Sequence, residues 1–154
     1  MNQRLADWLA RYEIVVMFAI AIWKWPSVPE KIPIHWNIAG NIDGYGSKFT
    51  GLLLIPIVAL AGYALIGLTA VIRPEQFQGQ VMSALSWFRL AYVMLMGGVF
   101  CVIVTDTLYG ANFNMNYVVF LLLAFVMLTS ANLLVQLSRS KPARTAPPGG
   151  GVRI

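Results

Sequence analysis

Three long apolar stretches constrain this chain more than any other feature. Residues 51–72, 85–105 and 115–137 are each predominantly apolar. A helix needs roughly 20 such residues to cross a bilayer core of about 30 Å. Lipid offers the backbone no hydrogen-bond partners, so spanning segments of this length favour helices over open strands. The sequence therefore predicts a helical bundle embedded in a membrane.

Composition supports this prediction and limits the possible partners. Of 154 residues, 58% are hydrophobic and only 11% are charged, too few charges to cover a soluble globule. The net charge of +5 comes from cations that are spread thinly rather than clustered, so we exclude nucleic acid as a partner and expect a lipid bilayer instead. Cys101 is the only cysteine, which rules out an intrachain disulfide. We expect no cofactor.

A fourth span is predicted near the N-terminus, although its apolar run is shorter. Apolar residues precede residues 14–25 at helical spacing: Leu5, Trp8, Leu9 and Tyr12. We therefore expect one helix over about residues 5–26. A signal peptide is the alternative, but residues 23–26 make a poor small-residue cleavage site, which favours an uncleaved anchor.

The distribution of Lys and Arg predicts the orientation of the four spans. Short cytoplasmic loops retain an excess of these residues. With both termini in the cytoplasm, eight cations lie inside: Arg4, Arg11, Arg73, Arg89, Arg139, Lys141, Arg144 and Arg153. Only Lys24, Lys31 and Lys48 then lie outside. This orientation places the loop at residues 27–50 on the outer face.

The predicted fold is an all-α integral membrane protein with four transmembrane helices and a structured extracytoplasmic loop between the first two. A single domain is expected over residues 1–137, with helices at about 5–26, 51–72, 85–105 and 115–137. We expect residues 138–154, rich in Pro and Gly, to form a disordered cytoplasmic tail. The predicted location is the inner, cytoplasmic membrane of a cell.

The outer loop at residues 27–50 carries the only histidine and a pattern typical of a folded cap. Ile32, Ile34 and Trp36 alternate with Pro33 and His35 in the period of two that indicates a strand. Turn-forming residues follow, and we expect tight reversals at Gly40, at Asp43 with Gly44, and at Gly46. Trp36 and Tyr45 suit the headgroup level of a membrane, and Lys48 can anchor the second span by snorkelling.

We interpret this loop as the candidate site for binding a ligand or a partner. The candidate residues are Pro33, His35, Trp36, Asn37, Gly40, Asp43, Gly44, Tyr45, Gly46, Ser47 and Lys48.

For His35, one reading is a ligand-binding or pH-responsive group, and the other is a histidine that hydrogen-bonds the local loop. His35, Asp43 and Ser47 could supply a catalytic triad, but residue types alone do not fix its geometry. A calcium site would have only one carboxylate. We therefore expect no catalytic residues, no metal and no enzymatic activity.

Polar residues inside the predicted spans are few. Arg89 and Asp106 fall near the ends of the third span, where we expect boundary residues that reach interfacial water. Asn132 is the candidate for a hydrogen bond between helices. The sequence shows no array of carboxylates that would mark an ion path.

The loop string resembles the signature of a bacterial and archaeal membrane domain of unknown function. The resemblance rests on PEKIPIHWNIAGNIDGYGSK at residues 29–48, with its ordered His-Trp-Asn, Gly, Asp-Gly-Tyr-Gly and Ser-Lys elements. That domain forms the N-terminal part of SdpI-type immunity proteins. The resemblance implies a polytopic membrane protein that protects a cell against a peptide toxin.

The chain departs from the full SdpI-type pattern after residue 137. The family continues into further helices and an Arg-Thr-Pro-Trp element, whereas this sequence runs into the Pro- and Gly-rich segment. Two functions are therefore carried forward. One is recognition of a peptide toxin or envelope component through the outer loop, and the alternative is a structural accessory subunit of a larger membrane complex.

Overall fold

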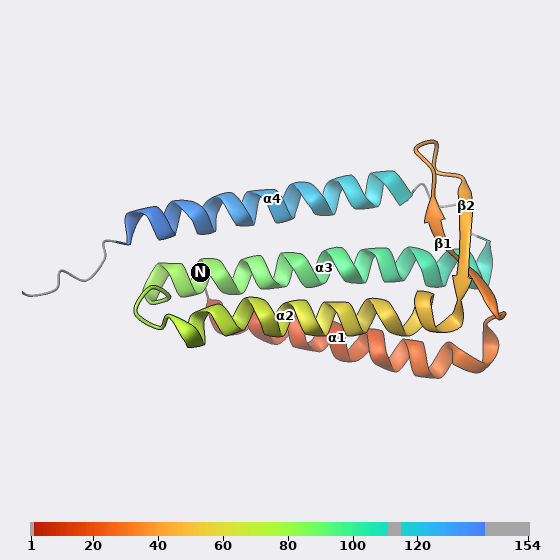
Figure 1. The fold of residues 1–154 in the computed structure, drawn as a ribbon, viewed down its shortest axis with the longest axis horizontal. Coiled ribbons are helices and arrows are strands. Elements are labelled where there is room, and N and C mark those ends of the chain that lie inside the picture. Colours follow the sequence, from red (N-terminus) through yellow and green to blue (C-terminus); the bar gives the residue numbers. More distant parts are fainter. Residues whose placement is uncertain (1, 111–114, 141–154) are drawn as a thin grey trace, which may run out of the picture.

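Four helices and a small hairpin make up the computed structural model, which describes residues 2–110 and 115–140. The helices are α1 (Gln3–Lys24), α2 (Leu54–Ile72), α3 (Gly79–Tyr109) and α4 (Met115–Arg139). They run side by side along the long axis of the molecule (Figure 1). The hairpin lies at one end of the bundle, and the beginning of α1 and the end of α4 lie towards the other.

Three helices are long and apolar enough to cross a membrane among the residues that the structure describes. They are Phe49–Ile72, Gly79–Tyr109 and Asn116–Arg139. The structure is thus mostly helical, as predicted, and suited to a membrane. Helix α1 is not among the three, and its sequence carries five charged residues, which lower its hydropathy: Arg4, Asp7, Arg11, Glu13 and Lys24. A fourth span remains a prediction.

Helix α3 is the centre of the bundle because it contacts each of the other three helices. Its neighbour α1 presents a buried face at helical spacing, which consists of Ala6, Ala10, Ile14, Met17 and Ala21. The three alanines on this face allow the two backbones to approach closely. Val93, Phe100 and Ile103 on α3 complete the same buried cluster.

The helix ends follow local chemistry. The Asn2 side chain accepts a hydrogen bond from the Arg4 amide at 3.1 Å and caps α1, whereas Pro26 stands in a short 3-10 turn, Trp25–Ser27, at its far end. Helix α3 ends at Tyr109, and the residue that follows, Gly110, has a φ of 57° that suits glycine. It begins six residues earlier than predicted, because polar residues such as Gln80 continue the helix beyond its apolar stretch.

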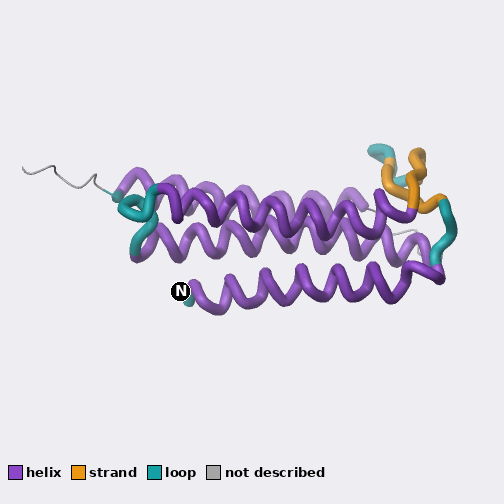
Figure 2. The backbone as a smooth tube through the Cα atoms, turned by 60° about the horizontal axis from the view of Figure 1, so that its bottom comes forward, coloured by secondary structure: helices purple, strands orange, loops and turns teal. Residues whose placement is uncertain are grey.

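The loop predicted to lie outside forms an antiparallel hairpin of β1 (Lys31–Trp36) and β2 (Ile42–Ser47), so the protein is not purely helical. Figure 2 shows both strands gathered at one end of the helices. The predicted reversals at Asp43–Gly44 and Gly46 are wrong, since these residues lie in β2, where Gly44 pairs with His35 of β1 and Gly46 pairs with Ile32. Gly40 is the one glycine of the hairpin with a positive φ, 84°. A π-helical turn, Phe49–Leu53, then leads into α2.

Close packing rather than turn geometry explains the glycines of β2. A Cβ atom at Gly44 would lie 2.8 Å from the Cβ of His35, and one at Gly46 would collide with the side chain of Ile34. Both glycines therefore allow the strands to approach each other. The predicted tail differs at its start, where Ser138 and Arg139 still belong to α4, and its residues 141–154 lie outside the described residues.

The anchoring of the hairpin by Ile32 can be tested with a matched pair of substitutions. Ile32 is fully buried, whereas Ile38 at the hairpin tip is 96% exposed. Ile32→Ala should lower the free energy of unfolding by about 2–5 kcal/mol, because it leaves a cavity in the core. Ile38→Ala should change it by less than about 0.5 kcal/mol. Thermal unfolding in detergent, followed by circular dichroism, measures both, and equal losses would contradict this packing.

Candidate functional site

The hairpin is fixed to the bundle through an apolar contact beneath β1. The side chain of Ile32 packs over Gly51, where an added Cβ would collide with it, and also belongs to the buried cluster that includes Ile103 of α3. Val28, just before β1, is buried as well. The hairpin is therefore part of the folded core and not a free loop.

Two polar contacts hold the far end of the hairpin against α3 and α4. The indole nitrogen of Trp36 donates a hydrogen bond to the Asp106 carboxylate at 3.0 Å. The side-chain amide of Asn116 donates to the carbonyl oxygens of Ile38 at 2.7 Å and Asn37 at 3.4 Å. We expected Asp106 to reach interfacial water, but it is only 7% exposed because the hairpin covers it.

Asn37 organises the turn between the two strands. Its side-chain oxygen accepts hydrogen bonds from the backbone amides of Ala39 and Asn41, each at 3.0 Å. Its backbone oxygen accepts from the Gly40 amide at 2.9 Å. This use of an asparagine side chain to close a turn leaves Ile38 projecting at the tip.

His35 and Asp43 face each other across the hairpin. The Nδ1 atom of His35 lies 2.5 Å from Oδ1 of Asp43, and their side chains are 69% and 43% exposed. The carboxylate orients the imidazole ring, so the Nε2 atom is the nitrogen left to meet a ligand. His35 therefore makes a contact within the loop, as one of its two readings expects, although its partner is a side chain. Its ring is also exposed, so the structure leaves the ligand-binding reading open.

Ser47 and Lys48 serve the junction with α2. The Ser47 hydroxyl lies 3.1 Å from the Thr50 hydroxyl and accepts from the Thr50 amide at 3.3 Å, so it supports the start of the next helix. Lys48 forms an ion pair with Glu30 at 3.0 Å. The hydrogen bonds of Ser47 thus go to Thr50 and not to the His35–Asp43 pair, and a triad is not assembled.

The candidate residues from the sequence therefore separate into two groups. Pro33, Trp36, Asn37, Gly40, Gly44, Gly46 and Lys48 are buried or partly buried and shape or anchor the hairpin. The exposed residues form what we call the hairpin face: His35, Asp43 and Tyr45, with Ile38 at the tip. Ser47 is exposed at the base of β2. Sequence reasoning did not select Ile38, although its place between Asn37 and Gly40 in a turn indicates exposure.

A second polar cluster, which sequence reasoning missed, joins α1, α2 and α3. The Asp7 carboxylate accepts hydrogen bonds from Arg89 at 3.2 Å and Ser86 at 3.1 Å. The Arg89 guanidinium lies 3.7 Å from the centre of the Tyr63 ring, a cation–π contact, and the Tyr63 hydroxyl accepts from Arg11 at 3.0 Å. Arg89 is thus not a boundary residue reaching for water but an internal partner of α1.

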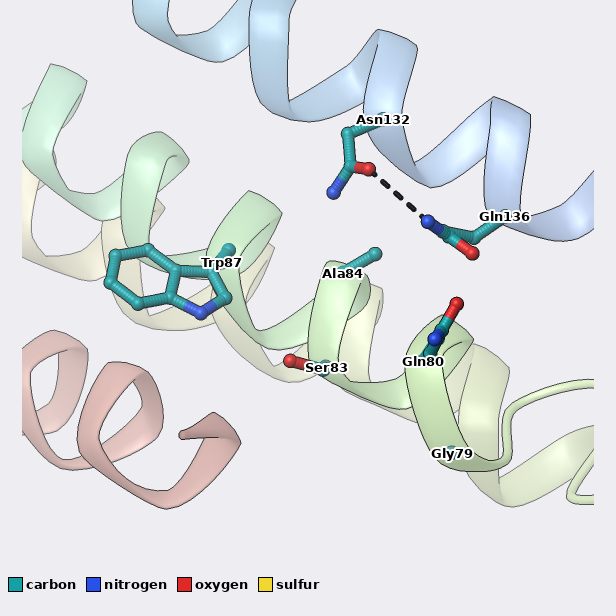
Figure 3. A pocket seen from close by; sticks show the side chains of 7 residues that line it. All are labelled: Gly79, Gln80, Ser83, Ala84, Trp87, Asn132 and Gln136. Atoms are coloured by element: carbon teal, nitrogen blue, oxygen red, sulfur yellow. Dashed lines mark hydrogen bonds between the residues drawn. The ribbon is translucent and has the colours of Figure 1, made fainter. Parts of the chain in front are cut away.

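A polar pocket of about 460 Å³ lies between the beginning of α3 and the end of α4. Figure 3 shows the amides of Gln80, Asn132 and Gln136 gathered there. Asn132 accepts a hydrogen bond from Gln136 at 3.5 Å, which lies on the same helix, so the expected bond between helices is not the one observed. Within residues 2–110 and 115–140, no three His, Cys, Asp or Glu residues gather as a metal site.

Comparison with known protein families gives a match that includes the hairpin. A protein-family model described as a domain of unknown function (DUF1648) matches residues 14–60. This match runs from the middle of α1 through the hairpin and into α2. No curated protein and no solved structure matches the chain. The match and the three apolar helices together fit a membrane protein of unknown function.

The hydrogen bond between Trp36 and Asp106 should hold the hairpin in place, and a double-mutant cycle tests it. Trp36→Phe removes the donor, Asp106→Ala removes the acceptor, and the double variant removes both. We expect a coupling energy of about 1.5–3 kcal/mol, as for hydrogen bonds to charged groups. Thermal unfolding gives this energy.

Hydrogen exchange provides a second measurement of the same contact. Amides of β1 and β2 should exchange faster in both single variants. The exposed Trp23 offers a matched control, because Trp23→Phe should leave hairpin exchange unchanged. A coupling energy near zero would show that the contact does not anchor the hairpin.

Proposed function

We propose that this protein is a small, non-enzymatic membrane protein that recognises a peptide or an envelope component through the hairpin face. The observation that carries the proposal is that one set of hairpin residues contacts the helices whereas another set is exposed. Its inner residues are committed to α3, α4 and the start of α2, whereas His35, Asp43, Tyr45 and Ile38 are exposed. A fixed backbone that displays such a group loses little entropy on binding.

The chemistry of the hairpin face suits a peptide. Tyr45 offers a large apolar area with a hydroxyl, and exposed aromatic residues of this kind are common anchors of interfaces. His35 and Asp43 together offer a donor or acceptor nitrogen and a carboxylate. The resemblance of residues 29–48 to the loop of SdpI-type immunity proteins adds the class of partner, a peptide toxin.

The distribution of Lys and Arg supports a placement of the hairpin face relative to the membrane. The excess of Lys and Arg at the end of the bundle away from the hairpin supports an orientation with both chain termini in the cytoplasm of a bacterial cell. The hairpin face then lies outside the inner membrane. A toxin that approaches from outside would meet it before reaching the bilayer.

Survival of a toxin-sensitive bacterial host tests the proposal. Cells producing the protein should tolerate membrane-active peptide toxins that kill cells without it. Tyr45→Ala and His35→Ala should each reduce this protection by about tenfold in the tolerated dose, as the loss of an interface anchor would. Tyr12→Ala is the matched control, because Tyr12 is as exposed as Tyr45 but lies on α1.

Membrane levels of each variant must be measured in the same cells. Unchanged protection by the Tyr45 and His35 variants at normal levels would contradict recognition through the hairpin face. Equal losses in Tyr12→Ala would show a general effect of the membrane domain instead.

A second function, an accessory subunit of a larger membrane complex, is favoured by one observation on α4. This helix packs mainly on α3, and only 6% of its most apolar stretch is buried. Exposed apolar residues cover much of its length: Tyr117, Phe120, Leu121, Met127, Leu128 and Leu134. A neighbouring subunit could cover this surface as well as lipid does.

Native mass spectrometry after gentle detergent extraction from the source cells tests the subunit function. The subunit function predicts a complex heavier than one chain, with a mass that is not a whole multiple of 17.0 kDa because it includes other proteins. Phe120→Ala with Leu128→Ala should weaken that complex, because these substitutions remove apolar contact area from α4. A bare monomer or homo-oligomer would rule out the subunit function and leave toxin recognition in place.

A further inference from the structure

A cavity of about 220 Å³ lies between α1 and α3, away from the hairpin face and the Asp7–Arg89 pair. Its walls are almost entirely apolar and include Val16, Met17 and Ile20 from α1 and Phe100, Cys101 and Val104 from α3. An engineered apolar cavity of about 150 Å³ accommodates benzene, so this volume is sufficient for a ring or a short alkyl segment.

Glu13 on α1 is the one charged residue among those that line this cavity. Glu13 is partly buried, and none of the described residues forms an ion pair or a hydrogen bond with it. The two other acidic residues within the helices have partners: Asp7 pairs with Arg89, and Asp106 accepts a hydrogen bond from Trp36. A carboxylate in apolar surroundings is costly unless a cation or a proton joins it.

Gly97 on α3 makes the room that the Glu13 carboxylate occupies. A Cβ atom at this position would collide with the Oε1 atom of Glu13. Any larger residue at position 97 would therefore displace the carboxylate from the cavity wall. The two residues form a matched pair, one providing the charge and the other the space for it.

The cavity is open at the side of the bundle. Cys101 on its rim is exposed, and Val16 and Ile20 are partly exposed. If α1 spans the bilayer, as the sequence predicts, this opening faces the acyl chains, so a molecule that dissolves in the membrane can enter without crossing the protein. Apolar pockets with one well-placed polar group are typical of sites for small ligands.

We propose that this cavity binds an amphiphilic cation, a molecule with an ammonium group attached to an apolar chain or ring. The ammonium group pairs with Glu13, and the apolar part lies against the residues of α1 and α3. This site is independent of the hairpin face and would exist whichever of the two proposed functions is correct. The combination of one unpartnered carboxylate, a glycine that accommodates it and an apolar, laterally open wall specifies this class of ligand.

Alkylation of Cys101 provides a direct test, because it is the only cysteine and lines the cavity. The protein in lipid nanodiscs is treated with N-ethylmaleimide in the presence of increasing dodecylamine, which is protonated at neutral pH. Dodecylamine should slow the alkylation. Dodecanol, with the same chain and no charge, should protect at least about tenfold less effectively, since a charge-assisted hydrogen bond is lost.

Two variants relate the protection to the proposed contact. Glu13→Gln should raise the dodecylamine concentration for half-protection by at least about tenfold. Glu75→Gln, the same substitution at an exposed residue between α2 and α3, should leave it unchanged. Gly97→Ala should resemble Glu13→Gln, because the added methyl group displaces the carboxylate, and it replaces that variant if Glu13→Gln does not fold.

Size-exclusion chromatography establishes that each variant is folded before labelling. Equal protection by dodecanol and dodecylamine would overturn the proposal and leave an apolar recess that any acyl chain fills. An unchanged half-protection concentration in folded Glu13→Gln or folded Gly97→Ala would overturn it as well.

Discussion

The lack of polar partners inside an apolar environment is the constraint on which the structure depends. Polar groups that α1 and the hairpin bury in the bundle need partners on neighbouring helices, and α3 provides two of these partners, Arg89 and Asp106. Arg89 of α3 pairs with Asp7 of α1, and Asp106, near the other end of α3, accepts the indole N–H of Trp36. These two contacts lie 17 positions apart along one helix, so α3 aligns α1 and the hairpin at the same time.

This arrangement explains why the hairpin can present a defined face although it is small. A two-stranded hairpin alone is marginally stable in water. Here Ile32 packs beneath it and the Asn116 side chain holds its turn, so the bundle supplies the missing stability. The exposed side chains of His35 and Asp43 contact each other rather than the helices. One face of the strands thus supports the fold, and the other is exposed.

The sequence predicted the features that depend on local pattern. Apolar stretches of sufficient length indicated α2, α3 and α4, and the alternation of Ile32, Ile34 and Trp36 indicated a strand. Two kinds of feature could not be predicted. Asp7 and Arg89 are 82 positions apart, and no local pattern pairs them. Glycine suits both a reversal and a close approach of strands, so the sequence alone predicts a turn at Gly44, and only the strand pairing separates these roles.

Glu13 is another residue whose surroundings could not be predicted from the sequence. In the sequence it is one acidic residue among the charges of α1, and it offers no signal of a site. In the structure it differs from Asp7, because Asp7 lies opposite an arginine whereas Glu13 lies opposite Gly97. The two carboxylates are six residues apart on one helix, yet Asp7 has a cation beside it and Glu13 has none among the described residues. A carboxylate without a cation in apolar surroundings is the observation on which the proposed ammonium site rests, because a cationic ligand would supply the partner that Arg89 supplies to Asp7.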